Sequence, residues 1–207
     1  MTVEKAVESL KNGRMIIVYD GDEREGEADL IFSARFVDPE KIERLRKDAG
    51  GLICAAINLE DASKINLPFF TELLEQGTVR EISCRKTAYG DSPAFSVPIN
   101  HVKVYTGITD NDRALTMKKL DEVITGRMDD FSKEFYSPGH VFLLIGRGLQ
   151  NRKGHTELAL ELGKRAGQKV MVLCEMLGKG KALPKEDAKE YAEKNGMVFL
   201  EGKEVIG

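Results

Sequence analysis

The chain has 207 residues, a length that fits one domain or at most two small ones. Hydrophobic residues make up 42% of it, and 31 Lys and Arg nearly balance 34 Asp and Glu for a net charge of −3. This composition supports a buried core and disfavours both a disordered chain and a nucleic-acid coat protein, which would need clustered excess basic residues.

Cysteine usage and the N-terminal segment indicate a cellular location. The three cysteines, Cys54, Cys84 and Cys174, are an odd number without Cys-x-x-Cys spacing, which excludes a disulfide scaffold. The N-terminus lacks an apolar stretch of signal-peptide length, and the longest apolar run, residues 52–57, is too short to cross a bilayer. We therefore expect a cytoplasmic protein that binds neither membranes nor nucleic acid.

The first part of the chain alternates helices with apolar strands. Apolar residues at helical spacing predict a helix over residues 3–12, and a buried strand over 15–19 follows. Asp38 and Pro39 supply the cap and first turn of a second helix, because these residue types favour those positions. That helix is expected to end before an apolar strand over 52–57.

The second part is less regular at its start. Residues 67–91 show no clear pattern, and two antiparallel strands are expected over 94–99 and 102–105, joined near Asn100. The later elements are expected as a helix over 110–126, a strand over 141–145, a helix over 155–167, a strand over 170–174, a helix over 184–195 and a strand over 197–200. This order predicts a mixed α/β fold, with residues 1–207 forming a single compact layered domain whose mixed sheet is flanked by helices.

The densest polar feature is the segment 20–29, which places six carboxylates and Arg24 directly after a buried strand. A solvated acidic turn is the usual reading of such a run. This one, however, leaves the carboxyl end of an apolar strand, where ligands bind in α/β sheets. Glu25, Glu27 and Asp29 alternate, so an extended segment would direct all three to one side. Convergent carboxylates favour a hard cation such as magnesium or manganese.

A second feature, residues 152–157, begins a predicted helix with Arg152, Lys153 and Gly154. Free backbone N–H groups, the helix dipole and a small residue favour a phosphate or another anion there, and Arg152 can bind it through two nitrogen atoms. An exposed basic lead-in to a helix is the alternative interpretation. His155 alone would be weak evidence, because a lone histidine is more often a structural hydrogen-bonding group.

Two further titratable residues lie at predicted strand ends. His140 follows Ser-Pro-Gly, and a tight turn there would hold its ring at the edge of a strand, which suits proton transfer. Glu175 directly follows the strand that ends at Cys174; burial would raise its pKa and make it a candidate acid or base, although a charge in this position is commonly structural. His101 lies near a predicted strand connection and is assigned no role.

Together these features resemble the 3,4-dihydroxy-2-butanone 4-phosphate synthase family of riboflavin biosynthesis, over almost the whole chain. Six motifs carry the resemblance in the family's order: Asp22-Glu23-Arg24-Glu25-x-Glu27-x-Asp29, Gly51-Leu52-Ile53-Cys54, Tyr105-Thr106-Gly107-Ile108-Thr109 with Asp112-Arg113, Pro138-Gly139-His140-Val141-Phe142, Arg152-x-Gly154-His155-Thr156-Glu157 and Cys174-Glu175-Met176. Gly26, Ala28 and residues 177–180 depart from the commoner pattern, which bears on loop and pocket closure more than on the reaction.

The resemblance implies a lyase that converts D-ribulose 5-phosphate to 3,4-dihydroxy-2-butanone 4-phosphate and formate. The implied steps are enediolate formation, dehydration, skeletal rearrangement and deformylation. Two Mg²⁺ or Mn²⁺ ions per site are implied, with Glu25 and His155 as protein ligands. His140, Glu175, Asp29 and Glu25 are the implied catalytic residues. The implied substrate contacts are Arg24, Glu27, Asp29, Cys54, Thr109, Arg152, Lys153, Gly154, His155, Thr156 and Glu175.

The resemblance also implies a homodimer with active sites at the interface, where His140 reaches across from the other chain. The length leaves no room for the GTP cyclohydrolase II domain of some relatives, so a monofunctional chain is expected. Two alternatives stay open. One is a sugar-phosphate-binding protein without catalysis, which would need only the phosphate-binding residues. The other is a different metal-dependent phosphosugar enzyme, such as an isomerase or a phosphatase.

Overall fold

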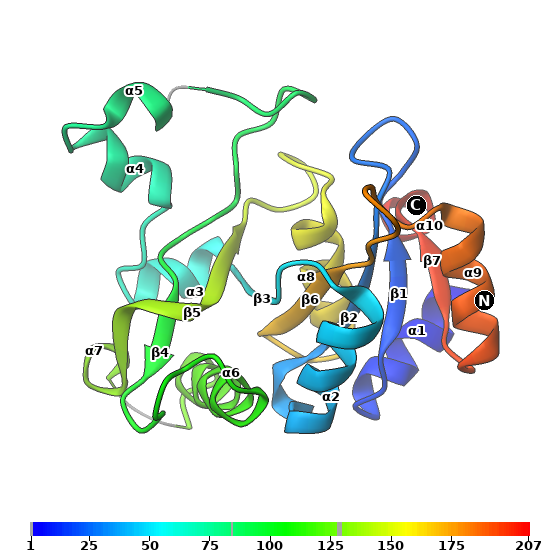
Figure 1. Ribbon diagram of the computed structural model, residues 1–207, viewed down its shortest axis with the longest axis horizontal. Coiled ribbons are helices and arrows are strands. Elements are labelled where there is room, and N and C mark those ends of the chain that lie inside the picture. Colours follow the sequence, from blue (N-terminus) through cyan, green and yellow to red (C-terminus); the bar gives the residue numbers. More distant parts are fainter. Residues whose placement is uncertain (1, 84, 128–129) are drawn as a thin grey trace.

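The computed structural model describes residues 2–83, 85–127 and 130–207, so Cys84 lies outside the described residues. One mixed sheet has the strand order β4-β5-β3-β6-β2-β1-β7 (Figure 1). The strands are β1 (Ile16–Tyr19), β2 (Ala28–Ser33), β3 (Cys54–Asn58), β4 (Ile99–His101), β5 (Phe135–Gly146), β6 (Met171–Glu175) and β7 (Phe199–Glu201). The pairs β1–β7 and β3–β5 are parallel, and the remaining neighbours are antiparallel. The expected mixed α/β fold is confirmed.

The helices are α1 (Thr2–Lys11), α2 (Pro39–Arg44), α3 (Leu59–Lys64), α4 (Phe70–Glu75), α5 (Arg80–Ser83), α6 (Asp110–Ile124), α7 (Phe131–Glu134), α8 (His155–Arg165), α9 (Lys185–Lys194) and α10 (Gly202–Ile206). A 3₁₀ turn (Ala34–Phe36) follows β2, and a π-helical turn (Leu45–Ala49) continues α2. Among the described residues, no helix is long and apolar enough to span a membrane.

Helices cover both faces of the sheet. On one face, α2, α6 and α9 pack against side chains such as Phe32 of β2. On the other face, α1, α8 and α10 pack against side chains such as Val18 of β1. Every residue of β1 and β2 is buried, which explains why residues 15–19 form a continuous apolar run rather than an alternating one.

Local capping chemistry sets the helix starts that the sequence predicts. The Asp38 side chain accepts a hydrogen bond from the Lys41 backbone N–H at 2.7 Å, and Pro39 is the first residue of α2. Thr109 caps α6 in the same way, since its hydroxyl accepts from the Asp112 N–H at 3.1 Å. Thr109 therefore has a structural role at the start of this helix.

The expected strand pair 94–99 and 102–105 is wrong. Only residues 99–101 form a strand there, and β4 pairs with β5 instead of folding back on the next segment. Val102 is half exposed and Tyr105 is 96% exposed, so the apolar residues of 102–105 face no sheet neighbour. Their composition suits a strand, but β-propensity depends on such a neighbour being present.

The strand β5 begins six residues earlier than expected, and the predicted loop 137–140 lies within it. The pairing shifts between Ile99, which lies opposite Val141, and Asn100, which lies opposite Tyr136. Residues 137–140 are therefore the extra residues of an irregularity in the β4–β5 pair. Gly139 is required there, because an added Cβ would lie 2.0 Å from the backbone carbon of Ile99.

Candidate active site

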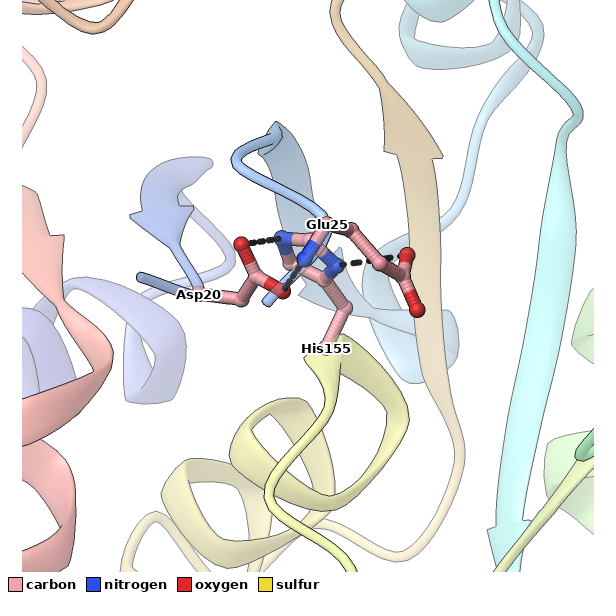
Figure 2. A group of neighbouring side chains, drawn as sticks. All are labelled: Asp20, Glu25 and His155. Atoms are coloured by element: carbon pink, nitrogen blue, oxygen red, sulfur yellow. Dashed lines mark hydrogen bonds and ion pairs between the residues drawn. The ribbon is translucent and has the colours of Figure 1, made fainter. Parts of the chain in front are cut away.

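The loop from β1 to β2 carries the acidic segment and faces the start of α8. Figure 2 shows Asp20 and Glu25 of this loop pointing toward His155, the first residue of α8. The Asp20 carboxylate is buried and accepts backbone N–H groups of Gly21, Glu25 and Glu27 at 2.8, 3.1 and 3.2 Å. Asp20 therefore shapes the loop that presents Glu25.

His155 lies at the centre of these carboxylates and is only 5% exposed. Its Nε2 is 2.9 Å from the carbonyl oxygen of Glu27; since a carbonyl only accepts, Nε2 is the donor. Its Nδ1 is 3.7 Å from Glu25 Oε2, and Nε2 lies 3.6 Å from Asp29 Oδ1 and 3.9 Å from Asp20 Oδ1. One ligand atom each from Asp20, Glu25 and His155 lies within 4.8 Å of the others.

Burial and crowding of negative charge shift the pKa values of this cluster. Burial raises the pKa of Asp29, and the charges of Glu175, Glu27 and Glu25 raise it further. Neither carboxylate oxygen of Asp29 has a hydrogen-bond partner among the described residues. Burial alone would lower the pKa of His155, but Asp29, Glu25 and Asp20 outweigh it and raise that pKa.

The pKa of Glu25 moves in the opposite direction. The His155 imidazole beside it lowers the pKa of Glu25 to about 2, against the effect of burial, and the Tyr89 hydroxyl and Arg152 add to the lowering. Glu25 is thus a carboxylate, while Asp29 is the carboxyl group of this cluster that most resists ionisation. Environments that separate the pKa values of neighbouring acids are typical of functional sites.

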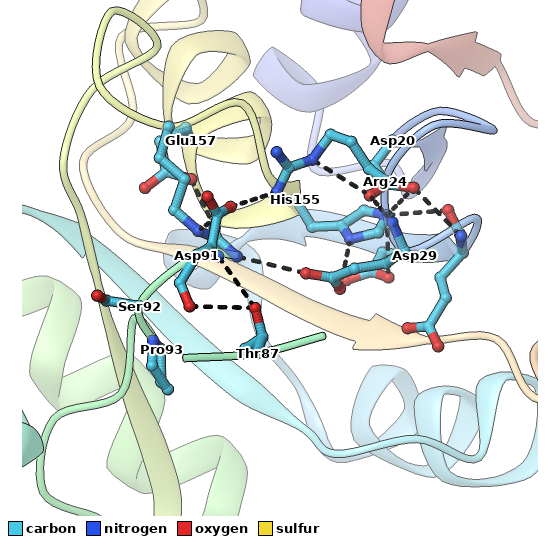
Figure 3. A network of polar contacts seen from close by, with 12 residues as sticks. Asp20, Arg24, Asp29, Thr87, Asp91, Ser92, Pro93, His155 and Glu157 are labelled. Carbon is cyan, nitrogen blue, oxygen red and sulfur yellow. Dashed lines mark hydrogen bonds and ion pairs between the residues drawn. The ribbon is translucent and has the colours of Figure 1, made fainter. Parts of the chain in front are cut away.

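Two arginines, Arg24 and Arg152, lie beside this cluster, and Figure 3 labels Arg24 together with Asp20 and His155. The Arg152 side chain is 9% exposed; its Nη1 donates to Glu157 Oε2 at 2.7 Å and its Nη2 lies 3.4 Å from Glu25 Oε1. Arg24 Nη2 and Arg152 Nε lie 2.8 and 3.3 Å from the same oxygen, Oδ2 of Asp91. The Nε atoms of both arginines are buried without a hydrogen-bond partner among the described residues.

The other expected anion-binding residues surround Arg152. Gly154 leaves room for its guanidinium, because a Cβ there would lie 2.2 Å from Arg152 Nη1. Thr156 is buried in the first turn of α8, whereas Lys153 is exposed. Arg24, Arg152 and Lys153 therefore lie next to the acidic cluster of Asp20, Glu25, Asp29 and His155.

Adjacent strands place three further expected residues together. Glu175 ends β6 opposite Asp29 of β2, and its Oε2 accepts from the Leu52 backbone N–H at 2.8 Å. Cys54 begins β3, the strand on the other side of β6, and is buried. Burial raises the pKa of the Cys54 thiol, and the charges of Glu175 and Asp29 raise it further, which makes this cysteine a packed thiol rather than a reactive one.

Two of the expected residues lie apart from this group. His140 is exposed on β5, its backbone N–H donates to Asn100 Oδ1 at 2.9 Å, and its Nδ1 lies 3.1 Å from Asn100 Nδ2. In the sheet, β5 and β2 are three places apart, which is about 14 Å at the usual strand spacing. Thr109 caps α6 and has no contact with the acidic cluster among the described residues.

The geometry adds residues that the sequence analysis does not single out. Asp20 belongs to the acidic segment, and its place directly after a buried strand is a signal that could have found it. Asp91 and Tyr89 come from the segment predicted to be irregular, and only the folded chain brings them to Arg24. His101, assigned no role, is fully buried, with its Nε2 3.0 Å from Glu134 Oε2.

A family model described as 3,4-dihydroxy-2-butanone 4-phosphate synthase matches residues 4–207. The chain belongs to this family. The 3,4-dihydroxy-2-butanone 4-phosphate synthase of Methanothermobacter thermautotrophicus is 39% identical, over 99% of this chain and 94% of its own. The enzyme of the same name from Methanosarcina mazei is 40% identical, over 99% of this chain and 89% of its own.

A solved structure agrees with these sequence comparisons. The crystal structure of a 3,4-dihydroxy-2-butanone 4-phosphate synthase in complex with two magnesium ions matches this fold with a TM-score of 0.79 and 27% identity, over 97% of this chain and 93% of that chain. The family membership expected from the six sequence motifs is confirmed.

Proposed function

We propose that this protein is a lyase that converts D-ribulose 5-phosphate to 3,4-dihydroxy-2-butanone 4-phosphate and formate in riboflavin biosynthesis. The observation that carries the proposal is the meeting of Asp20, Glu25 and His155 within 4.8 Å, directly beside the buried guanidinium of Arg152. A phosphosugar needs both parts, because cation ligands suit its hydroxyl and carbonyl oxygens and a guanidinium suits its phosphate.

The residues present fit a divalent cation. Two carboxylates and an imidazole offer ligand atoms of the kind that magnesium and manganese accept. The buried oxygens of Asp29 have no hydrogen-bond partner among the described residues, and a cation bound beside them would favour the ionised form of this carboxyl group. The Glu27 carbonyl fixes Nε2 of His155 as a donor, which leaves Nδ1, on the Glu25 side, for a ligand bond.

Glu25 and His155 would hold the metal, Mg²⁺ or Mn²⁺ with two ions per site, and Asp20 would hold the loop that presents Glu25. The cations would supply Lewis acidity toward the sugar oxygens, an effect worth several kcal/mol to the developing negative charge. The protein's part is to fix these side chains before the substrate arrives. Burial of Asp20 and His155 and the hydrogen bonds around them do so.

Proton transfer falls to the carboxyl groups around the sugar. Asp29 has a raised pKa and two oxygens without hydrogen-bond partners among the described residues, so either oxygen can hold or release a proton. A sugar bound next to Asp29 would exchange protons with it through a hydrogen bond. Glu175 is oriented by the Leu52 N–H, which leaves its other oxygen, Oε1, to accept or return a proton. Glu27 and Cys54 would line the sugar pocket beside them. Loss of a proton, of water and of formate all need such groups.

The phosphate would lie among Arg24, Arg152, Lys153 and the first turn of α8, at Gly154 and Thr156. Free backbone N–H groups and the positive end of the helix dipole favour an anion at this place. The binding energy of the phosphate would then position the reacting carbons of the sugar, which is how distant binding contributes to rate.

His140 and Thr109 complete the site if a second copy of the chain supplies part of it. Strand β5 lies three places from β2 in the same sheet, so His140 of one chain lies far from its own acidic cluster. A homodimer with sites at the interface would bring His140 of the other chain to the sugar for proton transfer. A cytoplasmic location stays a prediction.

Carbon NMR of the purified protein with ¹³C-labelled ribulose 5-phosphate and magnesium tests the function. We expect formate and a four-carbon phosphate, both abolished by a chelator. Binding without reaction would favour a sugar-phosphate-binding protein. Isomerisation or phosphate release without loss of carbon would favour another metal-dependent phosphosugar enzyme.

A further inference from the structure

A residue outside the six motifs supplies a carboxylate to the arginine pair of the candidate site. One oxygen of Asp91, Oδ2, lies 2.8 Å from Arg24 Nη2 (Figure 3) and 3.3 Å from Arg152 Nε. Under the proposed function, the same two guanidinium groups bind the phosphate of the substrate. Asp91 and the phosphate therefore need the same N–H donors.

Asp91 leaves this arginine pair incompletely satisfied. The Nε atoms of Arg24 and Arg152 are buried and have no hydrogen-bond partner among the described residues, although Asp91 lies close to both side chains. One carboxylate oxygen has about two acceptor sites, so Asp91 Oδ2 cannot satisfy all the N–H groups of two guanidinium groups. The three terminal oxygens of a phosphate monoester can, because each accepts hydrogen bonds in its own direction.

Asp91 belongs to a small closed turn, residues 87–91. The Thr87 backbone N–H donates to the carbonyl of Asp91 at 3.0 Å, and the Asp91 N–H donates to Thr87 Oγ1 at 3.1 Å. The same turn places the ring of Tyr89 5.6 Å from the guanidinium carbon of Arg24. These bonds make the turn one unit, so a displacement of Asp91 displaces Tyr89 with it.

The segment that carries this turn is anchored at both ends by Arg147. Its guanidinium lies 4.0 Å from the ring centre of Phe69, before α4, and donates to the carbonyls of Ser92 and Pro93 at 3.4 and 3.1 Å. Between these anchors, α4 and α5 contain no buried residue, and Figure 1 shows them (green) apart from the sheet. The turn can therefore leave the site while the ends of the segment stay in place.

Resting on the proposed function, we infer that Asp91 is an internal competitor for the substrate's phosphate. Binding of a phosphate monoester displaces the Asp91 carboxylate and releases the 87–91 turn from Arg24 and Arg152. A doubly charged phosphate can replace a single carboxylate at two guanidinium groups, whereas a neutral sugar cannot. Asp91 is thus a specificity-determining residue that favours phosphorylated over unphosphorylated ligands.

Calorimetric titration with inorganic phosphate at constant ionic strength tests the competition. We expect Asp91→Asn to bind phosphate about tenfold more tightly than the wild type, because the ligand no longer has to displace a charge-assisted contact. Glu81→Gln is the matched control: it removes one negative charge from exposed α5 in the same segment, and it should leave the affinity unchanged. Equal or weaker phosphate binding by Asp91→Asn would overturn the inference.

Hydrogen exchange of the full chain tests the release of the turn. In the wild type, phosphate should raise amide exchange in residues 87–91, because a turn without its contacts to Arg24 and Arg152 opens its own hydrogen bonds more often. In Asp91→Ala, exchange should already be high without phosphate. Protection of these amides by phosphate in the wild type would contradict the inference.

Neither measurement needs turnover, so failure of this inference can be distinguished from failure of the proposed function. Absence of formate with tighter phosphate binding by Asp91→Asn would refute the reaction alone; formate production with unchanged binding would refute the competition alone.

Discussion

At Gly51 the backbone runs so close to Glu175 that no side chain fits between them. An added Cβ would lie 2.5 Å from Glu175 Oε2 and 2.6 Å from its carbonyl oxygen. The backbone N–H of the next residue, Leu52, donates to the same carboxylate at 2.8 Å. Gly51 therefore sets the position of a proposed catalytic carboxylate although it has no side chain of its own.

We expect Gly51→Ala to lower kcat by about tenfold or more, because the methyl group displaces Glu175 and a misplacement of about 1 Å can cost roughly 100-fold. The rate of formate release at saturating substrate measures kcat. Gly50→Ala is the control: it has no neighbour within 4 Å but a φ of +87°, so it strains the backbone by about 1–2 kcal/mol without contacting Glu175. Equal loss of activity in both variants would mean that general destabilisation, rather than the position of Glu175, matters.

Glu25 offers a direct test of the proposed metal site. Glu25→Gln keeps the size of the side chain but removes the carboxylate, so Mn²⁺ affinity should fall more than about tenfold and turnover should be lost, while the melting temperature stays close to that of the wild type. A Mn²⁺ titration followed by electron paramagnetic resonance measures the affinity. Glu23→Gln, an exposed residue of the same loop, should change neither quantity. Retained affinity in Glu25→Gln would exclude this carboxylate as a ligand.

Among the secondary-structure elements, the sequence predicts those whose determinants are local. Asp38 and Thr109 cap α2 and α6 through side chains three residues from the amides they bind, so the start of each helix is encoded within one turn. The pairing of β4 is not local, because its partner residues in β5 lie 34–42 positions further along the chain. Apolar residues at 94–99 and 102–105 suggest strands, but nothing nearby indicates which strand they would pair with.

The helix α3 shows how an element is held by a buried charge. Asp61 is 3% exposed; its Oδ2 accepts from Asn58 Nδ2 at 2.8 Å, and its Oδ1 accepts from the ammonium groups of Lys64 and Lys169, each at 3.2 Å. Burial alone would raise the pKa of Asp61, but these three hydrogen bonds outweigh it and lower the pKa. The contact with Lys169 links α3 to the segment before β6.

We expect Asp61→Asn to lower the free energy of unfolding by about 1–3 kcal/mol near neutral pH, the usual worth of a charged hydrogen bond. Because the folded pKa of Asp61 is below the unfolded one, its contribution is complete above the unfolded pKa and is lost as the pH falls through the folded pKa. The difference between wild type and variant should therefore shrink in acid. Urea unfolding at several pH values measures this.

The control for Asp61 is the neighbouring pair of Glu60 and Lys64. The Glu60 side chain is 80% exposed, and surface ion pairs contribute little to stability. Glu60→Gln should therefore change the unfolding free energy by only a few tenths of a kcal/mol at any pH. A difference between Asp61→Asn and wild type that stays constant from neutral to acidic pH would show that lost packing, rather than lost charge, destabilises the variant.

At the scale of the whole molecule, the sequence singles out most residues of the candidate site but not the contacts through which they meet. Glu25 and Asp29 lie in one motif and His155 in another, more than 120 positions further along the chain, and folding brings them together. The contact between Arg24 and Asp91 joins residues 67 positions apart, and Asp91 lies in a segment without a periodic pattern. No local spacing encodes such a contact, so only the folded chain reveals it.

The separation of His140 from Asp29 within one chain leads to a prediction about the assembly. If each active site combines Glu25 of one chain with His140 of the other, Glu25→Gln and His140→Ala variants are each inactive alone. In a mixed dimer, one site carries both defects and the other carries neither. Because random exchange makes half of all dimers mixed, we expect about a quarter of wild-type formate production after the two variants are mixed.

Two variants with defects in the same half of the site provide the matched control. Glu25→Gln and Asp29→Asn lie on one loop and strand of one chain, and each mixed dimer of this pair has two defective sites. No activity should therefore return, even when native mass spectrometry shows that the subunits have exchanged. If the pair Glu25→Gln and His140→Ala also stays inactive after complete exchange, His140 does not act across the interface, and its distance from the acidic cluster would argue against any part in the reaction.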